Sequence, residues 1–288
     1  MAPDRPRIRC ALSIAGSDSS GGAGIQADLK AFAACGVHGM TAITAITAQN
    51  TVGDDAIQAI EPEIILAQVR AVARDIGVDA VKIGMLGDAA TVHAVAMALD
   101  ELRAGADGEG PPVVLDPVMI SESGARLLEP EARAALVAEL LPRVTVATPN
   151  LPEARALAGL HDDGEHADEG DRAAAGDSPT EGEVIALARA VHALGPKIVV
   201  VTGGHRREAT DVYVDAERVV EIPGQRYPGG ATHGSGCTHS SVLAARLALG
   251  DHPLTAARVA RRRAAEAVRD GLTTVGEGSG PVDVLGVT

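Results

Sequence analysis

The sequence predicts an α/β fold in which a mostly parallel sheet carries helices on both faces. Short apolar runs that suit strands alternate with segments whose apolar residues recur at helical spacing, and this alternation is typical of parallel sheets. The chain has 288 residues, 46% of them hydrophobic, which is enough for a sizeable core. No composition change or linker divides it, so a single domain over 1–288 is the simplest interpretation.

The chain opens with a strand, a glycine-rich loop and a helix. Residues 10–15 are apolar and compatible with a strand, the loop GSDSSGGAG follows, and Ile25, Leu29 and Phe32 then recur at helical spacing. We interpret the basic residues 1–9 as a frayed tail.

The same two patterns predict the remaining elements. Residues 40–48 are rich in Ile and Thr and indicate a strand, although the spacing of three between Ile43 and Ile46 leaves this assignment ambiguous. Further strands are expected at 80–83, 112–115, 144–147 and 197–201. Helices are expected where apolar residues recur at 65, 69, 72 and 76, and over 89–102.

Residues 161–183 differ from the rest of the chain. They hold nine acids and one arginine, more than half of the net charge of −14. Their apolar residues are alanines, so burial cannot offset the entropy lost on ordering. We expect a mobile surface insertion, with a specific acidic docking site as the alternative.

Composition also limits the partners and the compartment. A net charge of −14 and only three aromatic residues disfavour nucleic acid and anionic membranes. Three distant cysteines suggest neither a disulfide framework nor a zinc site, and favour a reducing, cytoplasmic environment. No run approaches the roughly 18 apolar residues of a membrane span.

The segment THGSGC is the most informative for chemistry. Gly234, Ser235, Gly236 and Cys237 lead directly into a helical apolar pattern, so their N–H groups would point outward at the positive end of a helix dipole and bind an anion. The same position can lower a thiol pKa below about 8.5, which makes Cys237 a candidate base or hydroxyl-orienting group. The alternative is a tight turn followed by a small buried cysteine.

Carboxylates at predicted strand ends provide a second clue, while no P-loop motif occurs. Asp116 closes an apolar strand, and Glu153 lies three residues after Asn150 at a strand-to-helix junction. Such oxygen ligands, completed by water, suit Mg²⁺ beside phosphates. Glu153 could instead be an early-helix acid, and Asp116, before Pro117, a turn former.

Eight motifs in order resemble those of one family. They are AGSDSSGGAGIQADLKAFAACG, ITAQNT, KIGML, VLDPVM, TPNLPEA, GGH, THGSGCTHS and GEGSGPV. Over about residues 10–285, without the acidic insertion, the chain is similar to the hydroxymethylpyrimidine and phosphomethylpyrimidine kinases of thiamine biosynthesis, within the ribokinase-like superfamily. The resemblance implies a three-layer αβα sandwich, a homodimer, and the use of ATP and Mg²⁺. It also implies phosphorylation of 4-amino-5-hydroxymethyl-2-methylpyrimidine and then of its monophosphate.

The resemblance also assigns residues to the pyrimidine site. Gln49 is implied to hydrogen-bond the aminopyrimidine, because an amide both donates and accepts. Its pocket would be lined by Gly16, Asp28, Met85 and Val118. The alternatives are an exposed strand-end Gln49 and a Met85 that only fills the core.

On the phosphate side, the same resemblance makes Gly234 to Cys237 the anion hole and Cys237 the catalytic position. Asn150 and Glu153 would act through Mg²⁺ and water, and Asp116 would add charge nearby. The ATP phosphates would be approached by Thr202, Gly203 and Gly204.

One position departs from the family pattern. The residue before GGH is often lysine, and here it is Thr202, which donates a hydrogen bond but carries no charge. The missing charge would slow turnover or pass the task to Mg²⁺ or an arginine such as Arg206. Two alternative functions remain, a pyridoxal kinase-like activity and a non-catalytic pyrimidine-binding regulator.

Overall fold

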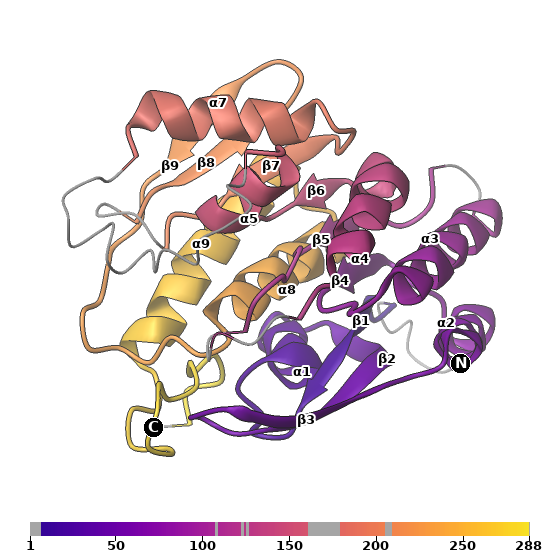
Figure 1. Ribbon diagram of the computed structural model, residues 1–288, viewed down its shortest axis with the longest axis horizontal. Coiled ribbons are helices and arrows are strands. Elements are labelled where there is room, and N and C mark those ends of the chain that lie inside the picture. Colours follow the sequence, from indigo (N-terminus) through magenta and orange to yellow (C-terminus); the bar gives the residue numbers. More distant parts are fainter. Residues whose placement is uncertain are drawn as a thin grey trace, which may run out of the picture.

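A single nine-stranded sheet runs through the computed structural model, which describes residues 7–106, 109–121, 124, 127–160, 179–204 and 209–287 (Figure 1). The strand order is β3-β2-β1-β4-β5-β6-β7-β8-β9. The strands are β1 (Cys10–Asp18), β2 (His38–Gln49), β3 (Asp54–Ala59), β4 (Ala80–Ile83), β5 (Val113–Leu115), β6 (Val146–Ala147), β7 (Ile198–Val201), β8 (Asp211–Val214) and β9 (Val219–Ile222).

Helices cover both faces of the sheet, as predicted. One face carries α2 (Pro62–Asp75), α3 (Ala89–Ala104), α4 (Pro130–Ala135) with the turns η1 (Leu136–Leu140) and η2 (Leu141–Arg143), α5 (Leu151–Leu157) and α7 (Glu181–His192). The other carries α1 (Gly24–Ala34), α8 (Ser235–Ala248) and α9 (Pro253–Arg269). The three-layer αβα architecture implied by the resemblance is therefore confirmed.

The six strands expected from the sequence are all present, and five of their pairings are parallel. The ambiguous segment at 40–48 is a strand. Sequence analysis missed β3, β8 and β9, which pair antiparallel at the two edges. The polar, largely exposed β3 lacks the apolar alternation that marks a half-buried strand.

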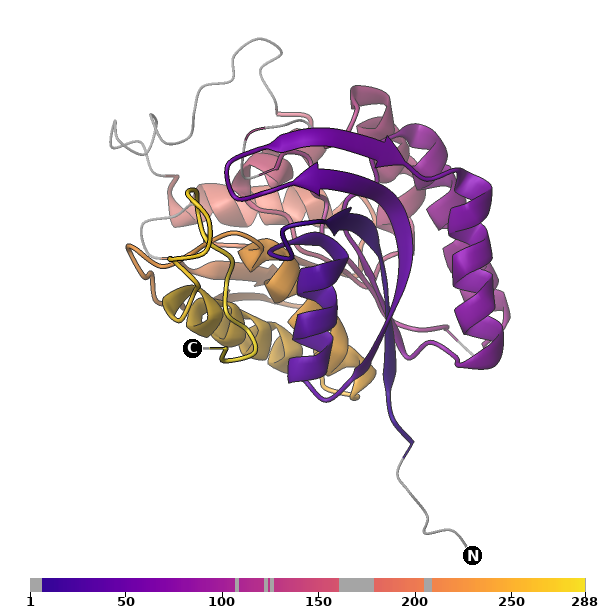
Figure 2. The same cartoon turned by 90° about the horizontal axis from the view of Figure 1, so that it is seen from below.

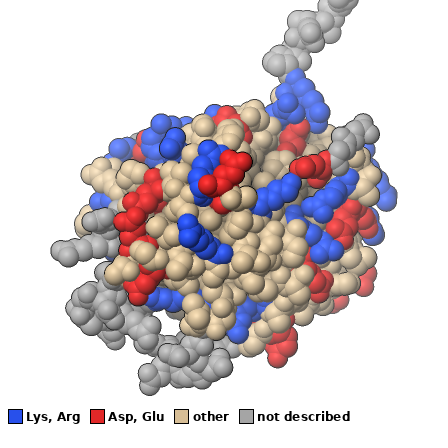
Figure 3. Space-filling view, turned by 90° about the horizontal axis from the view of Figure 1, so that it is seen from above, with Lys and Arg blue, Asp and Glu red and all other residues tan. Residues whose placement is uncertain are grey.

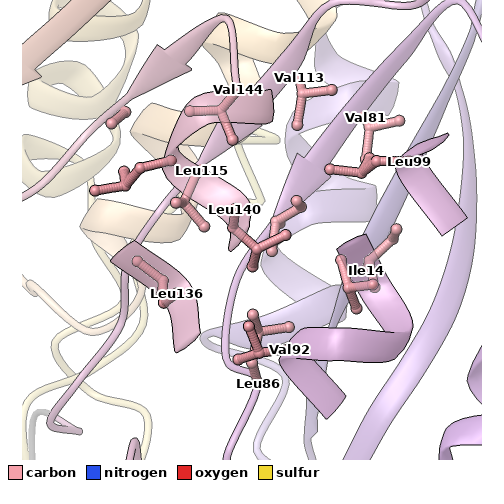
Figure 4. Packing of buried hydrophobic residues seen from close by; sticks show 14 of the residues in the cluster. Ile14, Val81, Leu86, Val92, Leu99, Val113, Leu115, Leu136, Leu140 and Val144 are labelled. Carbon is pink, nitrogen blue, oxygen red and sulfur yellow. The ribbon is translucent and has the colours of Figure 1, made fainter. Parts of the chain in front are cut away.

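The central strands are buried on both sides, which explains their continuous apolar runs. Figure 4 shows Ile14, Val81 and Leu115 of the sheet packed against Leu99 and Leu140 of the covering helices. On the opposite face the buried side chains of α9 are all alanine, which lets this helix approach α8 closely.

The β2–β3 pair forms a long, curved ribbon (Figure 2). The C-terminal segment reaches its turn, where Gly278 N–H donates to Thr51 Oγ1 at 3.3 Å. The same segment continues beside the loop before α8, because His233 and Pro281 form a bridge. Residues distant in sequence therefore close around one end of the sheet.

The acidic insertion is only partly within the described residues, since 161–178 lie outside them. Its expected end at residue 183 is wrong, because α7 begins at Glu181. Thr180 and Glu183 form a capping box there, with Glu183 N–H donating to Thr180 Oγ1 at 3.3 Å. Of the expected tail, residues 7–9 form no regular element, and 1–6 lie outside the described part.

On the face shown in Figure 3, basic and acidic side chains are interspersed. Among the described residues, no helix is both long enough and apolar enough to cross a membrane.

Candidate active site

A cavity of about 1680 Å³ extends across the carboxyl ends of the parallel strands. Residues that follow β1, β4, β5, β6 and β7 line it, and so does the amino-terminal end of α8. Most of the site residues expected from the sequence line this cavity: Gly16, Gln49, Met85, Asp116, Val118, Asn150, Glu153, Thr202, Gly204, Gly234, Ser235, Gly236 and Cys237.

The loop before α8 bends sharply into the helix. Gly234 has φ +83°, and a Cβ there would collide with the carbonyl oxygen of Gly22, so only glycine fits. We expected four outward-pointing amides, but Ser235 does not supply one, because its N–H donates to Thr232 O at 2.9 Å. The amides of Gly236 and Cys237 lie in the first turn, where helix geometry offers no carbonyl partner, so they remain suited to an anion.

Cys237 does not have the lowered pKa that its helix position suggests. Burial raises the pKa of its thiol to about 12, and the carboxylates of Asp28 and Asp116 add to the rise. The Lys82 ammonium and a hydrogen bond from Gly24 N–H act in the opposite direction but are outweighed. At pH 7 the thiol is therefore neutral, so it is suited to orienting a hydroxyl group and poorly suited to acting as a base.

A completely buried ion pair lies beneath this cysteine. Lys82 Nζ is 2.9 Å from Asp28 Oδ1, and both side chains are fully buried. Ser13 and Ser241 each donate to the Asp28 carboxylate at 2.6 Å. Asp28 is thus held behind the cavity wall, which corrects the expectation that it lines the pyrimidine pocket.

Lys82 itself does line the cavity, although sequence analysis gave it no role. A lysine inside the otherwise apolar strand AVKI was the available signal, because a buried charge requires a partner.

Two buried carboxyl groups with raised pKa values face the cavity. Burial is the main cause of the raised pKa of Asp116, and the Lys82 ammonium opposes it. Burial and the nearby Asp116 raise the pKa of Glu153 to about 8. Ser240 Oγ donates to Asp116 Oδ2 at 3.0 Å, which directs this carboxylate toward the start of α8. No group of three or more metal-ligand side chains occurs in the part of the chain that the structure describes.

Glu153 also stabilises the first turn of α5, which is the alternative role that the sequence left open. Asn150 N–H donates to Glu153 Oε2 at 2.8 Å and Glu153 N–H donates to Asn150 Oδ1 at 2.9 Å, forming a capping box on α5. Its other carboxyl oxygen is not needed for the cap. The capping role is therefore compatible with a ligand role in the cavity.

At the end of the cavity nearest β1 and β2 lie Gly16, Gln49 and Met85, and Val118 lines the cavity after β5. A Cβ on Gly16 would come within 3.1 Å of the Met85 sulfur. Met85 is half-buried and faces the cavity, so it does not merely fill the core. Thr47 Oγ1 donates to Gln49 Oε1 at 3.1 Å, which orients the amide.

At the opposite end, beyond β7, lie Thr202 and Gly204. Gly203 does not line the cavity, because its N–H donates to Asp211 at 2.8 Å and a Cβ on it would meet the backbone of Thr210. Its expected approach to the ATP phosphates is therefore corrected. Arg206 lies outside the described residues.

Asp18 and His233, both unassigned by the sequence, join the glycine-rich loop to the loop before α8. His233 Nε2 is 2.9 Å from Asp18 Oδ2. Burial favours the neutral acid, but hydrogen bonds from His233, Ser20 and Ala23 lower the pKa of Asp18 to about 2. The carboxylate therefore stays ionised and holds the two loops together.

The site combines an anion-binding helix start, two buried carboxyl groups and room for two ligands. With the three-layer αβα fold, this defines a small-molecule phosphotransferase of the ribokinase-like class. A sequence profile described as phosphomethylpyrimidine kinase matches residues 18–283. The chain belongs to the phosphomethylpyrimidine kinase family.

Individual relatives agree with this membership. A hydroxymethylpyrimidine/phosphomethylpyrimidine kinase of Rhizobium meliloti is 46% identical, with 94% of this chain and 95% of the relative covered. A crystal structure of phosphomethylpyrimidine kinase from Clostridium difficile matches with 38% identity and a TM-score of 0.71, covering 88% and 96% of the two chains. An ADP complex of Bacillus subtilis pyridoxal kinase matches with 35% identity and a TM-score of 0.81, covering 96% and 97%.

Proposed function

We propose that the cavity holds the aminopyrimidine at its β1–β2 end and ATP at its β7 end, with the start of α8 between them. The enzyme transfers the γ-phosphoryl group of ATP to the hydroxymethyl oxygen of 4-amino-5-hydroxymethyl-2-methylpyrimidine, and then phosphorylates the monophosphate. The observation that carries this proposal is the position of the Gly236 and Cys237 amides in the cavity wall, where they can stabilise the transferring group.

The pyrimidine end suits a flat, polar ring. Met85 and Val118 provide apolar contacts, and Gly16 lets the ring approach the backbone. The Gln49 amide presents both a donor and an acceptor to an aminopyrimidine edge.

The opposite end suits a nucleotide. Thr202 and Gly204 face the cavity nearest α8, where phosphates would lie. Beyond them Ala264, Ala265 and Val268 of α9 form an apolar wall against which a base can pack.

Mg²⁺ fits the donor set of this site. The raised pKa values of Asp116 and Glu153 indicate two buried carboxyl groups with too little neutralising charge. Mg²⁺ commonly binds through one or two carboxylates and keeps several waters, so these two side chains would hold it, directly or through water. The ion would neutralise phosphate charge.

The neutral Cys237 thiol orients the attacking hydroxyl in this reaction. The hydroxymethyl oxygen forms its bond to the γ-phosphorus as the bond to the β,γ-bridging oxygen breaks, and ADP leaves. In a loose transition state the hydroxyl loses its proton late, to an oxygen of the transferred phosphoryl group and from there to solvent, so no strong base is required.

A time course of ADP release tests the function, with pyrimidine products resolved by mass. We expect monophosphate and then diphosphate. Pyrimidine binding without any product would favour the regulatory alternative and contradict the proposal.

The variant Thr202→Lys restores the charge common in the family, so we expect a lower KM for ATP. An unchanged KM would show that the missing charge is supplied elsewhere.

Pyridoxal kinase activity is the second candidate, favoured by the likeness to the Bacillus subtilis enzyme. Comparing kcat/KM for pyridoxal and hydroxymethylpyrimidine decides between them. We expect the pyrimidine to be preferred, because a relative with the pyrimidine kinase name shares 46% identity and the pyridoxal kinase of Bacillus subtilis shares 35%.

We further propose a cytoplasmic, single-domain homodimer. The exposed Ile46, Val52 and Ile57 on and beside the β2–β3 ribbon support self-association at this edge. Sedimentation of wild type and Ile57→Lys tests it, with a monomeric wild type as the contradicting result.

A further inference from the structure

Two buried polar side chains and one partly buried arginine connect the β7 end of the cavity with α8 and α9. Asp211 opens β8, His239 lies in α8 two residues after Cys237, and Arg261 lies in the middle of α9. All three line the cavity, and the phosphoryl transfer described above uses none of them. We call this set the Asp211 network.

Asp211 is its centre. Its Oδ1 accepts the Gly203 N–H at 2.8 Å and lies 3.5 Å from Arg261 Nε, and its Oδ2 is 3.1 Å from His239 Nε2. Arg261 Nη2 also donates to Ala209 O at 2.5 Å. The network thus holds the backbone at two points, Gly203 and Ala209, near the β7 end of the cavity.

Two nitrogens of the network, His239 Nδ1 and Arg261 Nε, have no hydrogen-bond partner among the described residues. With His239 Nε2 donating to Asp211, His239 Nδ1 is left as an acceptor, and this side chain is only 5% exposed. Buried polar atoms normally have partners. An unsatisfied acceptor in a ligand cavity therefore indicates a group that a bound ligand or its water satisfies.

Arg261 is held in place by packing as well. A Cβ on Gly224 would collide with the guanidinium group, so only glycine at this position leaves Arg261 where it reaches Asp211.

We propose that Asp211, His239 and Arg261 are positioning residues of the nucleotide site, which hold the backbone around Gly203 and Ala209 in the conformation that binds ATP. This rests on the proposed placement of the nucleotide at the β7 end. Gln49 ends β2 and Met85 follows β4, whereas the network lies at β7 and β8, toward the other end of the strand order. The network therefore controls nucleotide affinity and leaves pyrimidine affinity unchanged.

The test measures ADP affinity by calorimetry without pyrimidine, together with both KM values. Arg261→Met and His239→Leu should each weaken ADP binding by about tenfold, as expected for losing one buried charge-assisted contact. The KM for ATP should rise in parallel, while the KM for the pyrimidine stays unchanged. His239→Gln keeps a donor toward Asp211 and should recover most of the affinity. Arg258→Met, an exposed position on the same helix, is the matched control.

Unchanged ADP affinity in folded Arg261→Met and His239→Leu proteins would overturn the proposal, as would an equal rise of both KM values. If Arg261→Met does not fold, Gly224→Ala decides on the same readouts, because it displaces the guanidinium without removing its charge. Failure of the proposed function would give a different result. The wild type would then bind ADP but form no phosphorylated pyrimidine, and the ADP affinities of the variants could still be compared with that of the wild type.

Discussion

Lys82 Nζ lies 2.9 Å from Asp28 Oδ1 in a fully buried ion pair beneath the start of α8. Asp28 also accepts hydrogen bonds from Ser13 and Ser241, so its charge is fully compensated. Lysine and aspartate come from different elements, β4 and α1, and the pair joins them beneath α8.

Breaking this pair should destabilise the fold strongly. Lys82→Met leaves Asp28 as an unpaired buried charge, and we expect a loss of about 3–5 kcal/mol in the free energy of unfolding, measured by urea denaturation. The double variant Lys82→Met with Asp28→Asn removes both charges and should recover most of the loss. A single variant that unfolds like wild type would contradict the pairing.

Cys237→Ala should lower kcat and leave the KM for the pyrimidine nearly unchanged, because the thiol orients the hydroxyl and binds little of the ring. We expect a decrease of about 100-fold, the loss typical of removing one positioned group at a reacting centre. Initial rates over a range of pyrimidine concentrations measure both constants. Cys35→Ala is the control, since Cys35 does not line the cavity. Full activity of Cys237→Ala would make this cysteine a packing residue.

Gln49→Leu should weaken pyrimidine binding, because a ring nitrogen would lose its partner in a desolvated site. The expected cost is about 1–3 kcal/mol, read as a higher KM for the pyrimidine at an unchanged KM for ATP. Gln58→Leu makes the same change on the exposed neighbouring strand and should behave as wild type. Equal pyrimidine affinity in both variants would remove Gln49 from the pocket.

The stability of the metal-free protein should fall between pH 5 and pH 8. The pKa of Glu153 is raised to about 8 in the folded protein, while an unfolded glutamate ionises near pH 4.5. The folded state therefore binds more protons across this interval, and the free energy of unfolding decreases as the pH rises, by at most about 1.4 kcal/mol per pH unit.

Urea denaturation at several pH values measures this slope, and Glu153→Gln should flatten it. Glu181→Gln, in the first turn of α7, changes an exposed glutamate and should leave the slope as in wild type. Added Mg²⁺ at pH 8 should stabilise the wild type more than Glu153→Gln. Identical slopes in wild type and Glu153→Gln would contradict the role of this carboxyl group.

Much of the sheet was predictable because its central strands are short apolar runs between helical patterns. The edges were not. In β3 the polar residues Asp54, Asp55 and Gln58 hide the strand pattern, since pairing with β2 through the backbone decides the conformation there. The antiparallel pair β8–β9 was missed although Val212 and Tyr213 are buried.

The central strands, the helices between them, the family motifs and the helix start at Gly234 could be predicted from the amino-acid pattern. Protonation states and long-range partners depend on the folded structure. Cys237 has a raised thiol pKa because folding buries it among carboxylates, which a helix position alone does not reveal. Asp28 faces Lys82 because two elements far apart in the chain meet there, and Gly203 faces Asp211 because β7 and β8 pair antiparallel. Local spacing specifies helices and strands, whereas desolvation and long-range pairing depend on how those elements pack.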